Sequence, residues 1–147
     1  MSSRIEKIQT LVELAEIEED KALQTFSTIQ GQFQDHLQQL ETLRSYINEY
    51  SHSSSQSTIS PVQMLSTQAF VSKLHHAVTE EENKTDGFRD VMERAREAWV
   101  EKRSRSQALN KLLLKLKQTH QARLDKQEQR FMDELSGQTF TRNSQKR

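Results

Sequence analysis

The stretch that decides the fold is residues 22–50, ALQTFSTIQGQFQDHLQQLETLRSYINEY. Its large apolar side chains recur at alternating spacings of three and four residues. The same spacing runs back to the N-terminus, where only Glu19 and His36 interrupt it. A heptad pattern of this length predicts a coiled-coil helix over about residues 4–50. Its predicted seam positions are Ile5, Ile8, Val12, Ala15, Glu19, Ala22, Phe26, Ile29, Phe33, His36, Leu40, Leu43, Ile47 and Tyr50.

A serine-rich segment follows this helix. Residues 51–60 read SHSSSQSTIS, and serine hydroxyls compete with the helix for backbone hydrogen bonds, so this segment is the predicted loop. Ser60, Pro61 and Gln63 then match an N-cap, a first helical residue and the third position of a capping box. A second helix is therefore predicted to start at Pro61.

The second helix is predicted to span about residues 61–136, with Gly137 as its C-terminal cap and residues 137–147 as a frayed tail. Beyond its seam the apolar positions drift to Leu124, Phe131 and Leu135, as after a stutter. The predicted seam positions are Phe70, Leu74, Ala77, Glu81, Lys84, Phe88, Val91, Ala95, Ala98, Lys102, Arg105, Leu109, Leu112 and Leu116.

These two helices define the predicted fold class. The chain of 147 residues contains three glycines and one proline, too few for the turns of a β-rich fold, and only 33% of its residues are hydrophobic. We therefore expect residues 1–147 to form a single domain, an all-α antiparallel two-helix coiled-coil hairpin with a longer second helix. A hairpin folded about residues 51–60 would pair position i with about position 111 − i, leaving about thirty residues of the second helix without a partner.

Several function classes are disfavoured by the sequence. It has no cysteine, which excludes disulfides, and no apolar run long enough to span a membrane, so we expect a cytoplasmic protein. No phosphate-binding loop, HExxH motif or nucleophile elbow occurs. The chain is therefore expected to be non-enzymatic, with no catalytic, cofactor-binding or metal-binding residues.

Two polar residues of the predicted seam are candidate site residues. Under the predicted pairing His36 lies near His75 and His76, which favours a polar layer that fixes register over a three-imidazole metal site. Glu19 lies near residues 92–96, where a salt bridge to Arg94 or Arg96 is favoured over an acid–base pair. The single tryptophan, Trp99, is interpreted as a half-buried packing residue.

The charge is unevenly distributed along the chain. The formal net charge is zero, but residues 1–50 are acidic and residues 102–130 are basic. The predicted overhang therefore combines lysines with leucines that nothing in the hairpin covers, which indicates a partner-binding site. Its expected contact residues are Leu109, Lys111, Leu112, Leu113, Lys115, Leu116 and Lys117. Binding of nucleic acid by this basic end is an alternative, although aromatic stacking residues are missing from 100–130.

Short motifs occur in a fixed order along nearly the whole chain. The run from Leu40 to Tyr50, with Gln39 before it, has the pattern QL..L..Y..EY at the end of the first predicted helix. Further landmarks are Leu14-Ala15-Glu16, Gln68-Ala69-Phe70, Ala98-Trp99 and Asp125-Lys126-Gln127. In order and spacing these motifs resemble those of the FliJ family of the bacterial flagellar type III export apparatus.

The resemblance implies a specific role. FliJ proteins resemble the rotor stalk of F- and V-type ATPases and sit in the pore of the hexameric flagellar export ATPase. The family also contacts the cytoplasmic part of the FlhA export gate and binds export chaperones, peripheral to the inner membrane at the flagellar base. The family's gate surface maps onto Gln39, Leu43, Tyr46, Tyr50, Phe70, Leu74 and Ala77, whereas the next position, commonly histidine, is Glu81 here. The equivalent stalk protein of a virulence injectisome is the alternative within this class.

Overall fold

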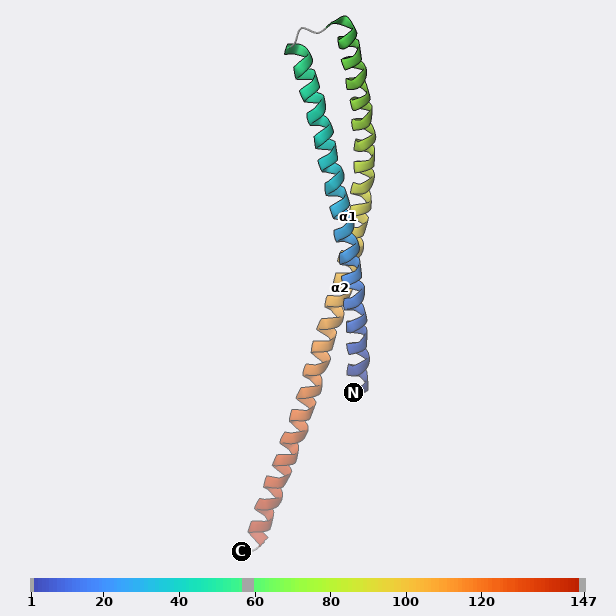
Figure 1. The fold of residues 1–147 in the computed structure, drawn as a ribbon. Coiled ribbons are helices and arrows are strands. Elements are labelled where there is room, and N and C mark those ends of the chain that lie inside the picture. The colour runs from blue at the N-terminus through green and yellow to red at the C-terminus, as the bar shows by residue number, and fades with distance from the viewer. Residues whose placement is uncertain (1, 57–59, 146–147) are drawn as a thin grey trace. The chain divides into compact units, whose positions relative to one another are not determined.

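The computed structural model describes residues 2–56 and 60–145, and the side chains of residues 3–52 and 60–144. It contains two helices, α1 (Ser2–Gln56) and the longer α2 (Pro61–Gln145), which pack against each other in opposite directions (Figure 1). No strand occurs among the described residues. The predicted all-α hairpin with a longer second helix is confirmed.

The start of α2 is the predicted capping box. The backbone N–H of Gln63 donates to the Ser60 hydroxyl oxygen at 3.2 Å, and the backbone N–H of Ser60 donates to Gln63 Oε1 at 3.2 Å. Pro61 is the first helical residue, where its missing N–H costs nothing. Two otherwise unsatisfied donors are thus bonded at this helix end.

The other helix ends lie further along the chain than the sequence predicted. α1 continues to Gln56 through part of the serine-rich segment, because nothing in that segment forbids helical backbone before Pro61. α2 continues past Gly137 to Gln145. Gly137 does not cap a helix here, since no glycine in the described chain has a positive φ and its carbonyl accepts a bond from the Thr141 hydroxyl at 2.9 Å.

The seam of α1 follows the predicted heptad closely. Every predicted position from Ile5 to Ile47 is buried or half-buried, while Tyr50 is 43% exposed. The seam of α2 agrees at eight of the fourteen predicted positions, among them Leu74, Glu81 and Phe88. At the other positions the next residue along the chain is the one that packs inward; these residues are Val71, Thr85, Met92, Trp99, Ser106 and Leu113.

The contacts divide the chain into two units, Asp20–Glu101 and Met1–Glu19 with Lys102–Arg147. In the first unit, Phe26 stacks on Trp99 with ring centroids 6.0 Å apart, and the Arg89 guanidinium lies 5.6 Å from the Phe33 ring centroid. Trp99 is half-buried and packs on the other helix, as predicted.

The register differs from the predicted one. Contacts such as Phe26 with Trp99 and His36 with Glu81 show that position i faces about position 121 − i, not 111 − i. The extra turns of α1 displace the fold-back point along the chain, which shifts the pairing by about ten residues. This shift changes which part of α2 is left uncovered.

Candidate partner-binding surfaces

The loop end of the first unit carries a partly apolar surface. Tyr50 of α1 and Phe70 of α2 meet edge to face, with ring centroids 4.8 Å apart, and both are 43% exposed. Tyr46, one turn before Tyr50, is 48% exposed. Aromatic side chains that remain half in solvent are typical of surfaces that bind other proteins.

The seven residues of the predicted gate surface divide into two groups. Three of them, Leu43, Leu74 and Ala77, are half-buried in the seam between the helices, next to the exposed residues. The exposed members are Gln39, Tyr46, Tyr50 and Phe70. The observed heptads place Gln39 and Tyr46 on the same flank of the seam as Phe70, so residues of both helices form one surface, the loop-end patch.

Glu81 does not extend the loop-end patch. Only 9% of Glu81 is exposed, and its carboxylate accepts a hydrogen bond from Nδ1 of His36 at 2.5 Å. His36 therefore pairs with Glu81 and stacks on Phe88 at 4.4 Å. The predicted approach of His36 to His75 and His76 is wrong, because it followed from the mistaken register.

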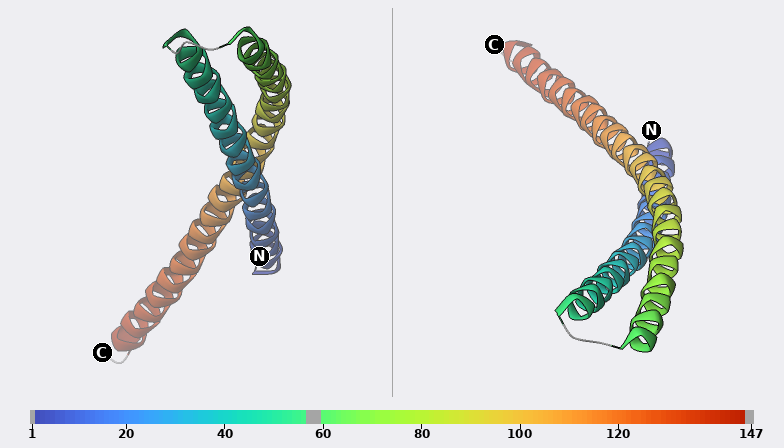
Figure 2. Two further views of the ribbon diagram at one scale, coloured as in Figure 1. Left: turned by 45° about the horizontal axis from the view of Figure 1, so that its top comes forward. Right: turned by 90° about the horizontal axis from the view of Figure 1, so that it is seen from above.

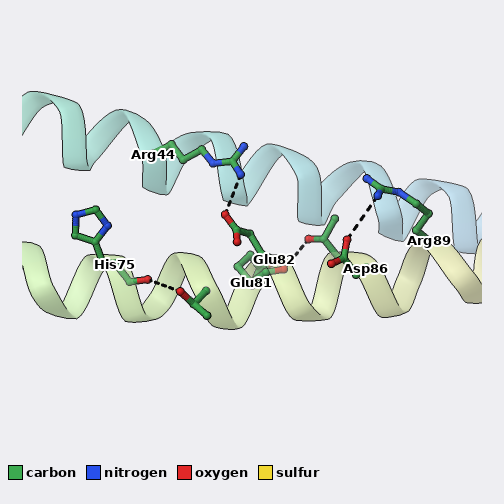
Figure 3. A network of polar contacts seen from close by, with 8 residues as sticks. Arg44, His75, Glu81, Glu82, Asp86 and Arg89 are labelled. Carbon is green, nitrogen blue, oxygen red and sulfur yellow. Dashed lines mark hydrogen bonds and ion pairs between the residues drawn. The ribbon is translucent and has the colours of Figure 1, made fainter.

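The opposite flank of the seam carries charge and a groove. Arg44 of α1 reaches across to Glu82 of α2, with Nη2 3.0 Å from Oε1 (Figure 3). Nearer the loop lies an open groove of about 540 Å³ that sequence reasoning missed. Its lining residues are Ser51, Met64, Thr67, Gln68, Val71, Ser72, His75, His76 and Thr79. The sequence signal for this groove is that Val62, Leu65 and Ala69, in the first turns of α2, do not follow the regular three-and-four spacing that begins at Phe70.

The leucines of the predicted overhang are mostly covered. Leu109, Leu113 and Leu116 are half-buried in the seam of the second unit. Leu112 is 38% exposed, and the lysines predicted with it, Lys111, Lys115 and Lys117, are exposed. The expectation that nothing within the hairpin covers these leucines is therefore wrong, because the true register brings the N-terminal turns of α1 alongside them.

The uncovered part of α2 begins at about residue 121, beyond these leucines. Both views in Figure 2 show α2 continuing beyond the N-terminal end of α1, and every side chain from residue 121 to residue 144 is exposed. Leu124, Phe131 and Leu135 recur at spacings of seven and four and share one face of the helix. They are 45%, 59% and 43% exposed, and with Met132 at 58% they form the uncovered stripe.

The charge imbalance of the chain is partly satisfied inside the second unit. The basic segment 102–117 lies alongside α1, whose residues 3–19 are acidic. Lys102 Nζ lies 3.3 Å from Glu18 Oε2, and the Asn110 amide donates to Glu16 Oε1 at 3.3 Å. The uncovered segment 121–145 has no net charge. Its basic residues are Arg123, Lys126, Arg130 and Arg142, and its acidic residues are Asp125, Glu128, Asp133 and Glu134.

Two other predictions concern single residues. Arg96 pairs with Glu93 of its own helix at 3.0 Å, not with Glu19 as predicted. Within the described residues, no group of three or more His, Asp or Glu side chains converges as metal ligands would. Neither helix, over the same residues, has a segment both long and apolar enough to cross a bilayer.

A comparison with protein-family models identifies the family of the chain. The model described as "Flagellar FliJ protein" matches residues 4–145, nearly the whole chain. Searches of curated proteins and of solved structures gave no match.

Proposed function

Because the chain belongs to the FliJ family and is thus a component of the flagellar export apparatus, we propose that it acts as the stalk of the export ATPase. In this proposal the uncovered segment of α2 binds in the pore of the hexameric ATPase, and the loop-end patch binds the FlhA export gate. The chain itself performs no chemistry. It works on the cytoplasmic side of the inner membrane at the flagellar base, through its partners, and also binds export chaperones.

The observation that carries the ATPase contact is the uncovered stripe. Beyond the hairpin α2 continues as a single helix. One face of this helix is apolar and is formed by Leu124, Phe131, Met132 and Leu135. Such a face on a water-soluble helix is stabilised by burial against a partner. A single helix is also narrow enough to enter a ring, since its diameter with side chains is about 10–12 Å.

In this proposal the uncovered stripe, and not the leucines between 109 and 116, supplies most of the apolar contact with the ATPase. Leu112 and the exposed lysines Lys111, Lys115 and Lys117 remain candidates at its base. The half-buried leucines 109, 113 and 116 act instead by holding α1 against α2. A helix that binds the assembled ring more tightly than separate subunits shifts the equilibrium towards the ring.

The proposal is tested by mixing the full chain with the purified export ATPase and measuring ATP hydrolysis and hexamer formation. Both should rise as the chain is added, and the concentration needed for half of the hexamer to form should fall. No change in either quantity would contradict the proposed function. The same assay at 0.05 and 0.5 M salt separates apolar burial from charge-driven binding, because burial persists at high salt.

The gate contact predicts a selective effect of Tyr46→Ala. Tyr46 is 48% exposed and lies on the flank of the seam, so the free energy of unfolding should change by less than about 0.5 kcal/mol. Affinity for the cytoplasmic part of FlhA should fall by about tenfold or more, as expected for an aromatic anchor.

A matched control for Tyr46→Ala is His75→Ala, on the opposite flank of the same unit. Calorimetric titration of both variants against the gate domain checks the prediction. If Tyr46→Ala binds like the wild type while His75→Ala binds weakly, the gate binds the flank that carries the groove, and the proposed gate surface is wrong.

A further inference from the structure

A polar layer interrupts the apolar seam near the middle of the first unit. His36 and Glu81 face each other across the two helices, with side chains 24% and 12% exposed. Beside them Thr85, 2% exposed, donates its hydroxyl to the Glu81 carbonyl at 2.7 Å. The layers on either side are apolar, since Leu40, Phe33 and Val78 are at most 9% exposed.

This polar layer requires specific partners on the facing helix, whereas the apolar layers do not. Burial of apolar side chains is not directional, so one heptad of this seam can face another with little loss. A buried carboxylate, by contrast, costs several kcal/mol unless a donor satisfies it. Here His36 Nδ1 is that donor, and Phe88 holds the imidazole in place by stacking at 4.4 Å.

A slip of one heptad would break this arrangement in either direction. If α2 slid by seven residues in one direction, Phe88 would take the place of Glu81 beside His36, and Glu81 would lie beside Leu43. If it slid in the other direction, His36 would lie beside Leu74 and Glu81 beside Ile29. Each slipped register therefore places both polar side chains against apolar partners.

We infer that His36 and Glu81 are positioning residues that select the register of the hairpin, and that they do so without adding to its stability. Replacing a buried ion pair by apolar residues is often neutral or stabilising, whereas one polar seam layer can specify register. The loop-end patch depends on that register, because it combines Gln39 and Tyr46 of α1 with Phe70 of α2. The inference about register stands whether or not the patch binds the gate.

The test uses pairs of introduced cysteines, since the chain has none of its own. Arg44→Cys with Glu82→Cys reports the observed register, in which these side chains meet at 3.0 Å. Arg44→Cys with Gln68→Cys, or with Arg89→Cys, reports a slip of one heptad, because position 44 faces about position 77 and both partners lie nine or more residues from it in the observed register. Each pair is treated with a short bismaleimide, and the rate of intramolecular cross-linking is measured.

In the wild-type background the 44–82 pair should react at least tenfold faster than either slipped pair. With His36→Leu and Glu81→Leu together, the preference should fall to about threefold or less, while the melting temperature stays the same or rises. A role in stability alone predicts the opposite, a lower melting temperature with the preference unchanged, and that result would overturn the inference.

A second variant keeps the inference testable if the double-leucine chain folds poorly. His36→Glu with Glu81→His keeps a complementary pair in the layer and should retain the tenfold preference for the 44–82 pair. If this exchanged pair loses the preference as the leucine pair does, a complementary polar layer is not what selects the register. The inference would also be overturned if both the double-leucine variant and the exchanged pair kept the tenfold preference for the 44–82 cross-link.

Discussion

Replacing Phe33 by alanine should lower the free energy of unfolding by about 3 kcal/mol, the largest stability effect we expect from one substitution. Phe33 is 7% exposed at the centre of the α1 seam, and the Arg89 guanidinium lies 5.6 Å from its ring centroid. The substitution removes a whole buried ring and leaves a cavity between two helices. Urea unfolding followed by circular dichroism measures the change.

Phe131→Ala is the matched control, because it removes the same side chain from an uncovered part of α2. Phe131 is 59% exposed, so its loss should change the free energy of unfolding by less than about 0.5 kcal/mol. Equal destabilisation by the two substitutions would mean that Phe131 is covered within the chain. The uncovered stripe would then not exist as described.

The largest functional effect is expected from Phe131→Asp combined with Leu135→Asp. These substitutions place two charges on the apolar face of the uncovered segment, so each removes an anchor that apolar burial would stabilise by about 2 kcal/mol. Affinity for the export ATPase should fall by about a hundredfold or more, because each 1.4 kcal/mol is a factor of ten. The stability of the hairpin should not change, since both residues lie beyond the seam.

Gln129→Asp with Ser136→Asp controls for charge in this experiment. It adds the same two charges at two exposed positions, seven residues apart, on another face of the segment. ATPase affinity should then stay within about threefold of the wild type by fluorescence titration. Equal losses for both double variants would show that net charge, and not the apolar face, determines binding.

The fold and one of the two seams could be predicted from the sequence alone. In α1 nearly every seam position is apolar, so periodicity identified them without ambiguity. In α2 the seam includes Thr85 and Ser106, each 2% exposed, while apolar Val91 and Leu112 lie outside it. A search for apolar residues cannot identify this seam, because the neighbours predicted in place of Thr85 and Ser106 are charged, and the seam residues next to Val91 and Leu112 are themselves apolar. Short hydroxyl side chains can fill a narrow seam once their hydroxyls bond to the helix backbone.

The register could not be predicted because it depends on where α1 ends. Serine is a poor helix former, but it is not sterically excluded as proline is, and the packing of the two helices outweighs its propensity. Reading the serines as a loop shifted the pairing by about ten residues. That error placed His36 beside two histidines and left the leucines from 109 to 116 uncovered, whereas the structure pairs His36 with Glu81 and covers three of those leucines.

The candidate partner surfaces were predicted only in part. The predicted gate surface came from the resemblance, and the structure adds that three of its seven residues are half-buried in the seam and four are exposed as the loop-end patch. The charge pattern wrongly suggested that the basic segment 102–117 faces an external partner. This segment lies against acidic turns of α1 within the chain. Sequence charge counts cannot distinguish an internal pairing from an external one until the register is known.

The central claim is that the two ends of this chain bind different partners, and site-specific cross-linking tests it most directly. Met132→Cys and Tyr46→Cys each introduce the only cysteine, on the uncovered stripe and on the loop-end patch. Each labelled chain, carrying a photoactivatable cross-linker, is mixed with the export ATPase and the cytoplasmic part of FlhA together. We expect Met132→Cys to capture the ATPase and Tyr46→Cys to capture the gate; the reverse pattern, or no capture of the ATPase from residue 132, would contradict the proposed stalk.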